Sequence, residues 1–170
     1  LAERRWTKKY KTEILRSRYE TTENLINLCG RLWSRPSTVL NASAIGYYGS
    51  REHEVLDEST LPGENFSSDL CLGWEKLSLK MQSSETRVCM LRFGVVFDRS
   101  GGALAQLSQS FHYKVGTQLG AGKQWMSWVH LEDVIRAMVF LLERDDLEGP
   151  FNITAPNPVM VSELSKAIAK

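Results

Sequence analysis

The sequence lacks an excess of charge of either sign, a long apolar run and a paired-cysteine motif. Its 170 residues include 21 Lys and Arg against 20 Asp and Glu, and this balance favours neither nucleic acid nor a membrane surface as partner. No apolar stretch approaches the about 20 residues of a membrane span, and no signal peptide opens the chain. Three cysteines, Cys29, Cys71 and Cys89, form no C-x-x-C pair. We therefore expect a cytoplasmic protein whose partner is a small molecule.

Two motifs of dinucleotide enzymes are also missing. No G-x-G-x-x-G phosphate loop occurs in the chain, and no tyrosine is followed four residues later by lysine. The opening residues, Leu1-Ala2-Glu3, have neither an initiator methionine nor targeting character. A chain of this length is expected to form one domain, or one domain plus a fragment, and its opening is that of a fragment.

Alternating strand and helix signals are what the sequence does contain. The apolar run of residues 39–49 ends in small and polar residues, and a second run covers residues 87–97. A helical pattern separates them, which predicts a parallel βαβ unit. We expect strands at 37–42, 87–92, 126–129 and 151–153, helices at 8–28, 66–81, 101–113, 131–142 and 161–170, and loops at 50–65 and 116–124.

These runs, together with the Ser-Trp-Val-His-Leu-Glu-Asp segment at 127–133, resemble an atypical, epimerase-like branch of the extended short-chain dehydrogenase/reductase superfamily, sometimes labelled cell-division-inhibitor-like. The resemblance implies an α/β fold: the carboxyl-terminal part of a Rossmann-like, doubly wound parallel sheet. Residues 1–170 would form a partial NAD(P)-binding domain, with elements of the small substrate-binding region within about residues 100–170. About half of the sheet, including the phosphate loop, would precede residue 1. It further implies NAD or NADP as cofactor and a nucleotide-sugar-like substrate.

The end of the first predicted strand carries the main candidate site. Open α/β sheets bind ligands at the carboxyl ends of their strands, and the family places there a serine that bonds a substrate oxygen. The resemblance therefore makes Ser43 a candidate catalytic residue, although a register shift of one would put Ala44 in its place. The other candidates are Ala42, Ser43 and Arg92 for the cofactor, and Tyr47 and Tyr48 for the substrate. The alternative is a polar turn that packs the two tyrosines.

Arg92 ends the second strand of the βαβ unit and has three possible roles. It reaches the cleft, pairs with a carboxylate of the 50–65 loop, or forms a purely structural ion pair.

The superfamily's Tyr-x-x-x-Lys pair is replaced in this chain. On the predicted helix at 66–81, Cys71 stands at the tyrosine position and Glu75 at the lysine position. The two side chains share a helix face, and a nearby carboxylate raises the pKa of a thiol. We therefore interpret Cys71 as a buried structural residue rather than a proton donor.

Two downstream segments complete the candidate site. The glycine-rich loop, with Gly120, Gly122 and Gln124, is either an anion-binding loop at the substrate cleft or a plain connection. His130 resembles the family's histidine between a short strand and a helix, and no second ligand at metal spacing accompanies it. Because the carboxyl ends of parallel strands share one edge, we expect Ser43, Tyr47, Arg92, this loop and His130 to converge there, rimmed by the acidic 50–65 loop.

Two functions remain open from the sequence. One is an NAD(P)-dependent epimerase or oxidoreductase that acts on a nucleotide-sugar-like molecule. The other is a non-catalytic, nucleotide-binding regulatory module that kept the fold and lost the Tyr/Lys pair.

Overall fold

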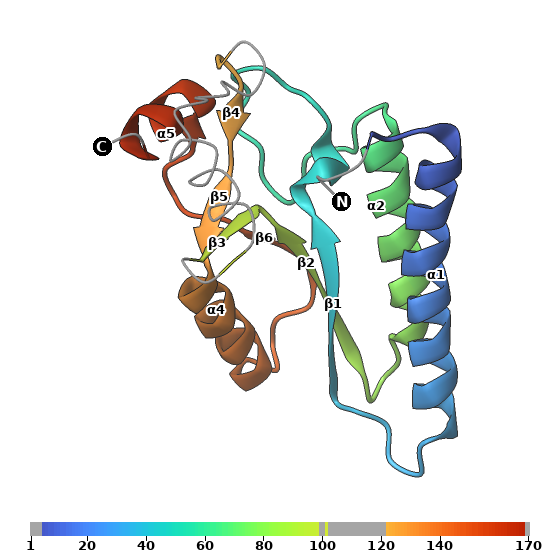
Figure 1. The fold of residues 1–170 in the computed structure, drawn as a ribbon. Coiled ribbons are helices and arrows are strands. Elements are labelled where there is room, and N and C mark those ends of the chain that lie inside the picture. The colour runs from blue at the N-terminus through green and yellow to red at the C-terminus, as the bar shows by residue number, and fades with distance from the viewer. Residues whose placement is uncertain (1–4, 99–100, 102–121, 169–170) are drawn as a thin grey trace.

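A computed structural model describes residues 5–98, 101 and 122–168 (Figure 1). The helices are α1 (Lys8–Arg31), α2 (Phe66–Ser78), α4 (Leu131–Glu143) and α5 (Val161–Ile168), with 3₁₀ turns η1 (Ile45–Tyr48) and η2 (Leu79–Met81). The strands are β1 (Thr38–Ala44), β2 (Arg87–Phe93), β3 (Val95–Asp98), β4 (Trp125–Met126), β5 (Trp128–His130), β6 (Gly149–Ile153) and β7 (Val159–Met160). The α/β class expected from the sequence is therefore present.

The main sheet consists of β1, β2 and β6 in that order, and both strand pairs are parallel. The helices α2 and α4 lie between these strands along the chain, as parallel connections require. Two smaller sheets adjoin it: β3 pairs with β5 in parallel, and β4 pairs with β7 antiparallel. Parallel pairing aligns the carboxyl ends of β1, β2 and β6 at one edge, which is the upper edge in Figure 1.

Helices cover both faces of the main sheet (Figure 1). On one face, Val88 and Met90 of β2 pack with Val39, Met81 and apolar residues of α1. On the other, Cys89 and Leu91 of β2 pack with Val134 and Leu141 of α4. Successive side chains of a strand point to opposite faces of the sheet, and helices cover both faces here. Residues 88–91 of β2 are therefore all apolar.

Local sequence signals explain where α1 and α2 begin and how closely they pack. The hydroxyl oxygen of Thr7 accepts the backbone N–H of Tyr10, and the amide oxygen of Asn65 accepts that of Ser68, so both helices have side-chain N-caps. Gly73 faces α1, where a Cβ atom would overlap the Tyr19 hydroxyl. The glycine therefore permits the close contact between the two helices.

Most predicted elements are found, with shifted ends. Helix α1 continues to Arg31, β1 is displaced toward its carboxyl end, and the 66–81 helix finishes as the 3₁₀ turn η2. The strand predicted at 126–129 is wrong as one element, because β4 and β5 flank Ser127 and pair with different strands. The Ser127 carbonyl accepts the Val95 N–H at 2.9 Å. The predicted helix at 101–113 lies outside the described residues, apart from Gly101. None of the helices described is long and apolar enough to cross a membrane.

A buried arginine joins the opposite end of the sheet to α4. Arg87, at the start of β2, donates from Nη2 to the carbonyl of Leu141 at 2.6 Å and from Nη1 to that of Leu147 at 2.8 Å. The last carbonyl groups of a helix have no intrahelical partner, and a guanidinium satisfies them well.

We expect Arg87→Met to lower the free energy of unfolding by about 2–3 kcal/mol, because it leaves buried carbonyl groups without a donor. Urea titration monitored by circular dichroism measures this change. Arg136→Met is the control, since Arg136 pairs only at the exposed surface of α4 and its loss should have no measurable effect. An equal response of the two variants would contradict the capping role of Arg87.

Candidate functional site at the carboxyl edge of the sheet

Ser43 and Arg92 lie side by side at the carboxyl edge of the main sheet. They are direct partners in the register of β1 and β2, and both side chains point to the face covered by α2. Each is only 3% exposed. The sheet edge thus brings together two residues that are 49 positions apart, but it buries them instead of opening them to a cleft.

Glu75 of α2 holds these two residues together. Its Oε1 accepts the Ser43 hydroxyl at 2.6 Å and the Arg92 Nε at 2.9 Å, and its Oε2 accepts Arg92 Nη2 at 2.8 Å. The pair is therefore bidentate, and Glu75 itself is 5% exposed. Of the three roles that the sequence left open for Arg92, pairing with a carboxylate of the 50–65 loop is wrong. The carboxylate that pairs with Arg92 belongs to Glu75 of α2. The Ser43 proton is committed to Glu75, which leaves the serine oxygen as an acceptor.

Two tyrosines of η1 surround the Arg92 guanidinium. The Tyr48 hydroxyl accepts Arg92 Nη1 at 2.9 Å and donates to Asn152 Oδ1 at 2.7 Å. The Tyr47 ring centroid lies 3.6 Å from the guanidinium carbon, a cation–π contact. Burial raises the pKa of the Tyr48 phenol, and the hydrogen bond from Arg92 offsets part of this rise. The phenol is therefore neutral at pH 7. Within the described residues the Tyr47 hydroxyl makes no hydrogen bond, whereas Tyr48 is fully engaged.

Among the described residues of the acidic loop, Glu58 bonds both Arg92 and Asn152. The Glu58 carbonyl accepts Arg92 Nη1 at 3.3 Å, and its Oε1 accepts the Asn152 backbone N–H at 2.7 Å. Sequence reasoning named neither Glu58 nor Asn152. Asn152 follows the same rule that identified Ser43, since it is a polar residue near the carboxyl end of a parallel strand, whereas no signal separates Glu58 from the other carboxylates of its loop.

Cys71 lies one turn before Glu75 on the same buried face of α2, as the spacing predicted. Burial raises the pKa of its thiol, and the Glu75 carboxylate raises it further. The Arg92 charge lowers the pKa of the thiol, but this effect is smaller than the two that raise it, so the thiol is protonated at neutral pH. The direction of the shift is the one expected from a neighbouring carboxylate.

The remaining candidates have other contacts. His130 accepts the Glu132 backbone N–H through Nδ1, so its ring caps α4. The carbonyl groups of Gly122 and Gln124 accept backbone N–H groups at the start of α5. Gly120 lies outside the described residues, and the described part of the chain contains no group of His, Cys, Asp and Glu fit to hold a metal. These contacts do not link His130 to the cluster around Arg92.

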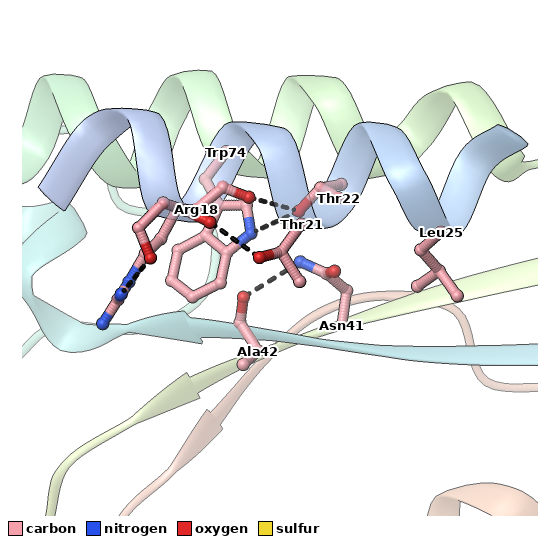
Figure 2. A pocket seen from close by; sticks show the side chains of 8 residues that line it. Arg18, Thr21, Thr22, Leu25, Asn41, Ala42 and Trp74 are labelled. Atoms are coloured by element: carbon pink, nitrogen blue, oxygen red, sulfur yellow. Dashed lines mark hydrogen bonds between the residues drawn. The ribbon is translucent and has the colours of Figure 1, made fainter. Parts of the chain in front are cut away.

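A cleft of about 280 Å³ lies elsewhere, between α1, α2 and β1 (Figure 2). Its polar wall includes the Trp74 indole, which donates to the Thr22 hydroxyl, and the Asn41 amide, which donates to the Ala42 carbonyl. The lining residues are Ser17, Arg18, Thr21, Thr22, Leu25, Asn41, Ala42 and Trp74. Ala42 is the sole sequence-predicted site residue among them.

Comparison with known proteins gives a consistent result. The sequence profile of the NAD dependent epimerase/dehydratase family matches residues 1–154. An epimerase family protein of Mycobacterium bovis is 38% identical over 170 residues, which are 100% of this chain and 56% of that protein. A chloroplastic epimerase family protein, the SDR39U1 homolog of Arabidopsis thaliana, is 36% identical over 96% of this chain and 48% of its own length. The chain thus spans about half the length of these curated relatives.

Solved structures agree with the sequence comparison. Human epimerase family protein SDR39U1, solved with NADPH, matches with a TM-score of 0.88 and 27% identity over 98% of this chain and 58% of that one. A nucleoside-diphosphate sugar epimerase of Corynebacterium glutamicum matches with a TM-score of 0.85 and 30% identity, over 98% of this chain and 36% of that one. The fold is therefore that of epimerase proteins over part of their length.

We expect Arg92→Met to lower the free energy of unfolding by about 3–5 kcal/mol, because it leaves the Glu75 carboxylate buried without its cation. The double variant Glu75→Leu/Arg92→Met should lose at least about 1 kcal/mol less than the sum of the two single losses. Denaturant titrations of all three variants measure the coupling. Strictly additive losses would show that the two groups do not interact, and Arg16→Met, which breaks an exposed pair on α1, is the surface control.

The Cys71 thiol should resist alkylation. Iodoacetamide at pH 8 should modify the half-buried Cys29 well before Cys71, because burial and a raised pKa both suppress the Cys71 thiolate. Peptide mass spectrometry over a time course identifies the order, and urea-unfolded protein, in which all three cysteines should react, is the control. Preferential labelling of Cys71 in the folded protein would contradict the structural role.

Proposed function

Because the chain belongs to the NAD dependent epimerase/dehydratase family, we propose that it forms the substrate-side part of an NAD(P)-dependent epimerase or oxidoreductase for a nucleotide sugar. The main support for this proposal is the position of Ser43 and Tyr47 at the shared carboxyl edge of β1 and β2, where α/β folds bind ligands. Neighbouring folds support the substrate class: MoeE5 was solved with UDP-glucose and NAD, and a Bacillus cereus epimerase with UDP-glucuronic acid and NAD.

Each residue of the proposed site has a distinct role. The Tyr47 hydroxyl, which has no hydrogen-bond partner in the described residues, would donate to a substrate oxygen. The cation–π contact with Arg92 would keep the Tyr47 ring in place. Ser43 is buried and bonded to Glu75, so it would position Glu75 and Arg92 beneath the ligand without touching it. We assign substrate contacts also to Gly122 and Gln124 at the end of the glycine-rich loop.

The cofactor fits this part of the chain only in part. A bound nicotinamide dinucleotide would supply hydride transfer to and from a substrate carbon. Ala42 is small and exposed beside Ser43, which suits the nicotinamide end, whereas Arg92 has its guanidinium occupied by Glu75, Tyr48 and Glu58. The sequence contains no G-x-G-x-x-G loop for the pyrophosphate. We therefore expect these residues to contact one end of the dinucleotide.

One observation favours the non-catalytic alternative. The superfamily dyad needs a cation beside its phenol, but Glu75 at the lysine position carries a carboxylate and Cys71 at the tyrosine position a neutral thiol. A module that binds a nucleotide sugar without transforming it would keep the Tyr47 contact and need no such dyad.

Binding measurements test the proposal. We expect calorimetry to detect UDP-glucuronic acid or UDP-glucose binding to the 170-residue chain, and Tyr47→Phe to weaken it about fivefold, the loss of one hydrogen bond. Tyr10→Phe, on α1 and outside the cluster around Arg92, is the matched control. NADPH should bind at least about 100-fold more weakly than to the human relative, because a helix-terminus phosphate site is missing from the sequence.

Two results would refute these expectations. If neither UDP sugar binds, or if Tyr47→Phe and Tyr10→Phe bind equally well, the site is elsewhere. Hydride transfer to NAD⁺ during incubation with the sugars, read from nicotinamide absorbance, would favour the enzyme over the regulatory alternative.

A further inference from the structure

Four residues from four segments form a closed ring of hydrogen bonds at the carboxyl edge. Arg92 Nη1 donates to the Tyr48 hydroxyl at 2.9 Å, and that hydroxyl donates to Asn152 Oδ1 at 2.7 Å. The Asn152 backbone N–H donates to Glu58 Oε1 at 2.7 Å, and the Glu58 carbonyl accepts Arg92 Nη1 at 3.3 Å. Three members belong to β2, η1 and β6, and Glu58 alone comes from the loop.

The loop between η1 and α2, residues 50–65, is a strap over this edge. In Figure 1 it rises from η1 toward β4 and returns to α2. Near its base, Arg51 donates to the Tyr48 carbonyl and the Gly63 N–H to that of Tyr47. At its far end the Trp125 indole of β4 donates to His53 Nδ1 at 2.9 Å. The base thus has several bonds, whereas the middle of the strap touches β2 and β6 through Glu58.

Glu58 uses the two donors that an anion at this edge would need. Arg92 Nη1 is a charged donor and the Asn152 N–H is a fixed backbone donor, and both face the same residue. The adjacent Asp57 does not compete, since its carboxylate caps Ser59 and Thr60 within the strap. Glu58 itself is exposed, so water competes for its carboxylate and releasing it costs little.

We propose that the Glu58 carboxylate is an internal substitute for an anionic ligand group: it pins the strap to the Asn152 N–H, and an anionic ligand displaces it there and takes Arg92 Nη1 from the Glu58 main-chain carbonyl. The displacing group is a carboxylate or a phosphate. With the pin released, Arg92 keeps its bidentate partner Glu75 and still has Nη1 to offer, so the cation is never left unpaired. This inference rests on the proposed function for the choice of a nucleotide sugar as the ligand.

The energetic consequence is a reduced apparent affinity. A ligand that binds only the open state has its affinity lowered by the fraction of molecules that are open. Removing the pin should therefore tighten binding without adding a contact. A merely structural pin predicts the opposite, because a loosened edge binds more weakly.

The experiment compares Glu58→Ala with wild type in two measurements. Native-state amide exchange, followed by NMR, should show the Asn152 N–H exchanging about tenfold faster in the variant, as expected for loss of a hydrogen bond to a carboxylate. Calorimetry with UDP-glucuronic acid, UDP-glucose and inorganic pyrophosphate should show at least about fivefold tighter binding. A gain for UDP-glucuronic acid alone identifies the carboxylate, and a gain for all three identifies the phosphates.

Matched variants separate the outcomes. Glu54→Ala removes an exposed carboxylate of the same strap, whose one ion pair within the described residues is with the half-buried Arg51, and it should behave as wild type. Glu58→Gln keeps the acceptor oxygen without the charge, so its Asn152 exchange rate and its affinities should lie between those of wild type and Glu58→Ala. It also replaces Glu58→Ala as the test variant if that protein fails to fold. Unchanged exchange of the Asn152 amide, or faster exchange with equal or weaker binding of all three probes, would overturn the proposal. Tighter pyrophosphate binding with no binding of either UDP sugar would support the strap and refute the proposed substrate.

Discussion

The buried ion pair between Glu75 and Arg92 is the constraint on which the carboxyl edge depends. An arginine this deeply buried requires a full set of acceptors, and Glu75, Tyr48 and Glu58 supply them. Hydrogen bonding to Glu75 and Tyr48 raises the pKa of Arg92 despite the opposing effect of burial, so the charge is permanent. This one guanidinium therefore bonds β2 to both α2 and η1.

The same pair redefines the chemistry of the edge relative to the superfamily's Tyr-x-x-x-Lys arrangement. A lysine in the position of Glu75 would place positive charge beside Ser43, whereas here the helix contributes negative charge and the strand contributes the cation. The sign of the charge at the position of Glu75 is thus exchanged relative to that lysine. Glu75 still orients Ser43 through a hydrogen bond, and it keeps Cys71 neutral. The position of Ser43 therefore does not depend on a Tyr/Lys pair for proton transfer.

Much of the fold followed from periodicity, and less of the site did. The apolar runs at 39–49 and 87–97 and the helical pattern between them were sufficient to predict the βαβ unit, because these signals are local. The divided strand around Ser127 was missed because its halves pair with distant segments. Likewise, the sequence placed Glu75 beside Cys71 on one helix face, but the choice of Arg92 as its partner required the strand register. Glu58 could not be distinguished from its acidic neighbours, since its contacts are to a backbone N–H and through its own carbonyl.

Strand β2 serves two different layers with alternate residues: Val88, Met90 and Arg92 face α1 and α2, and Cys89 and Leu91 face α4. Inserting or deleting a single residue within this strand would exchange the two sets. The Arg92 charge would then be driven into the apolar layer beneath α4, while Glu75 would face a hydrocarbon side chain. Natural variation in this segment should therefore be confined to replacements, and length changes between relatives should fall in the loops on either side.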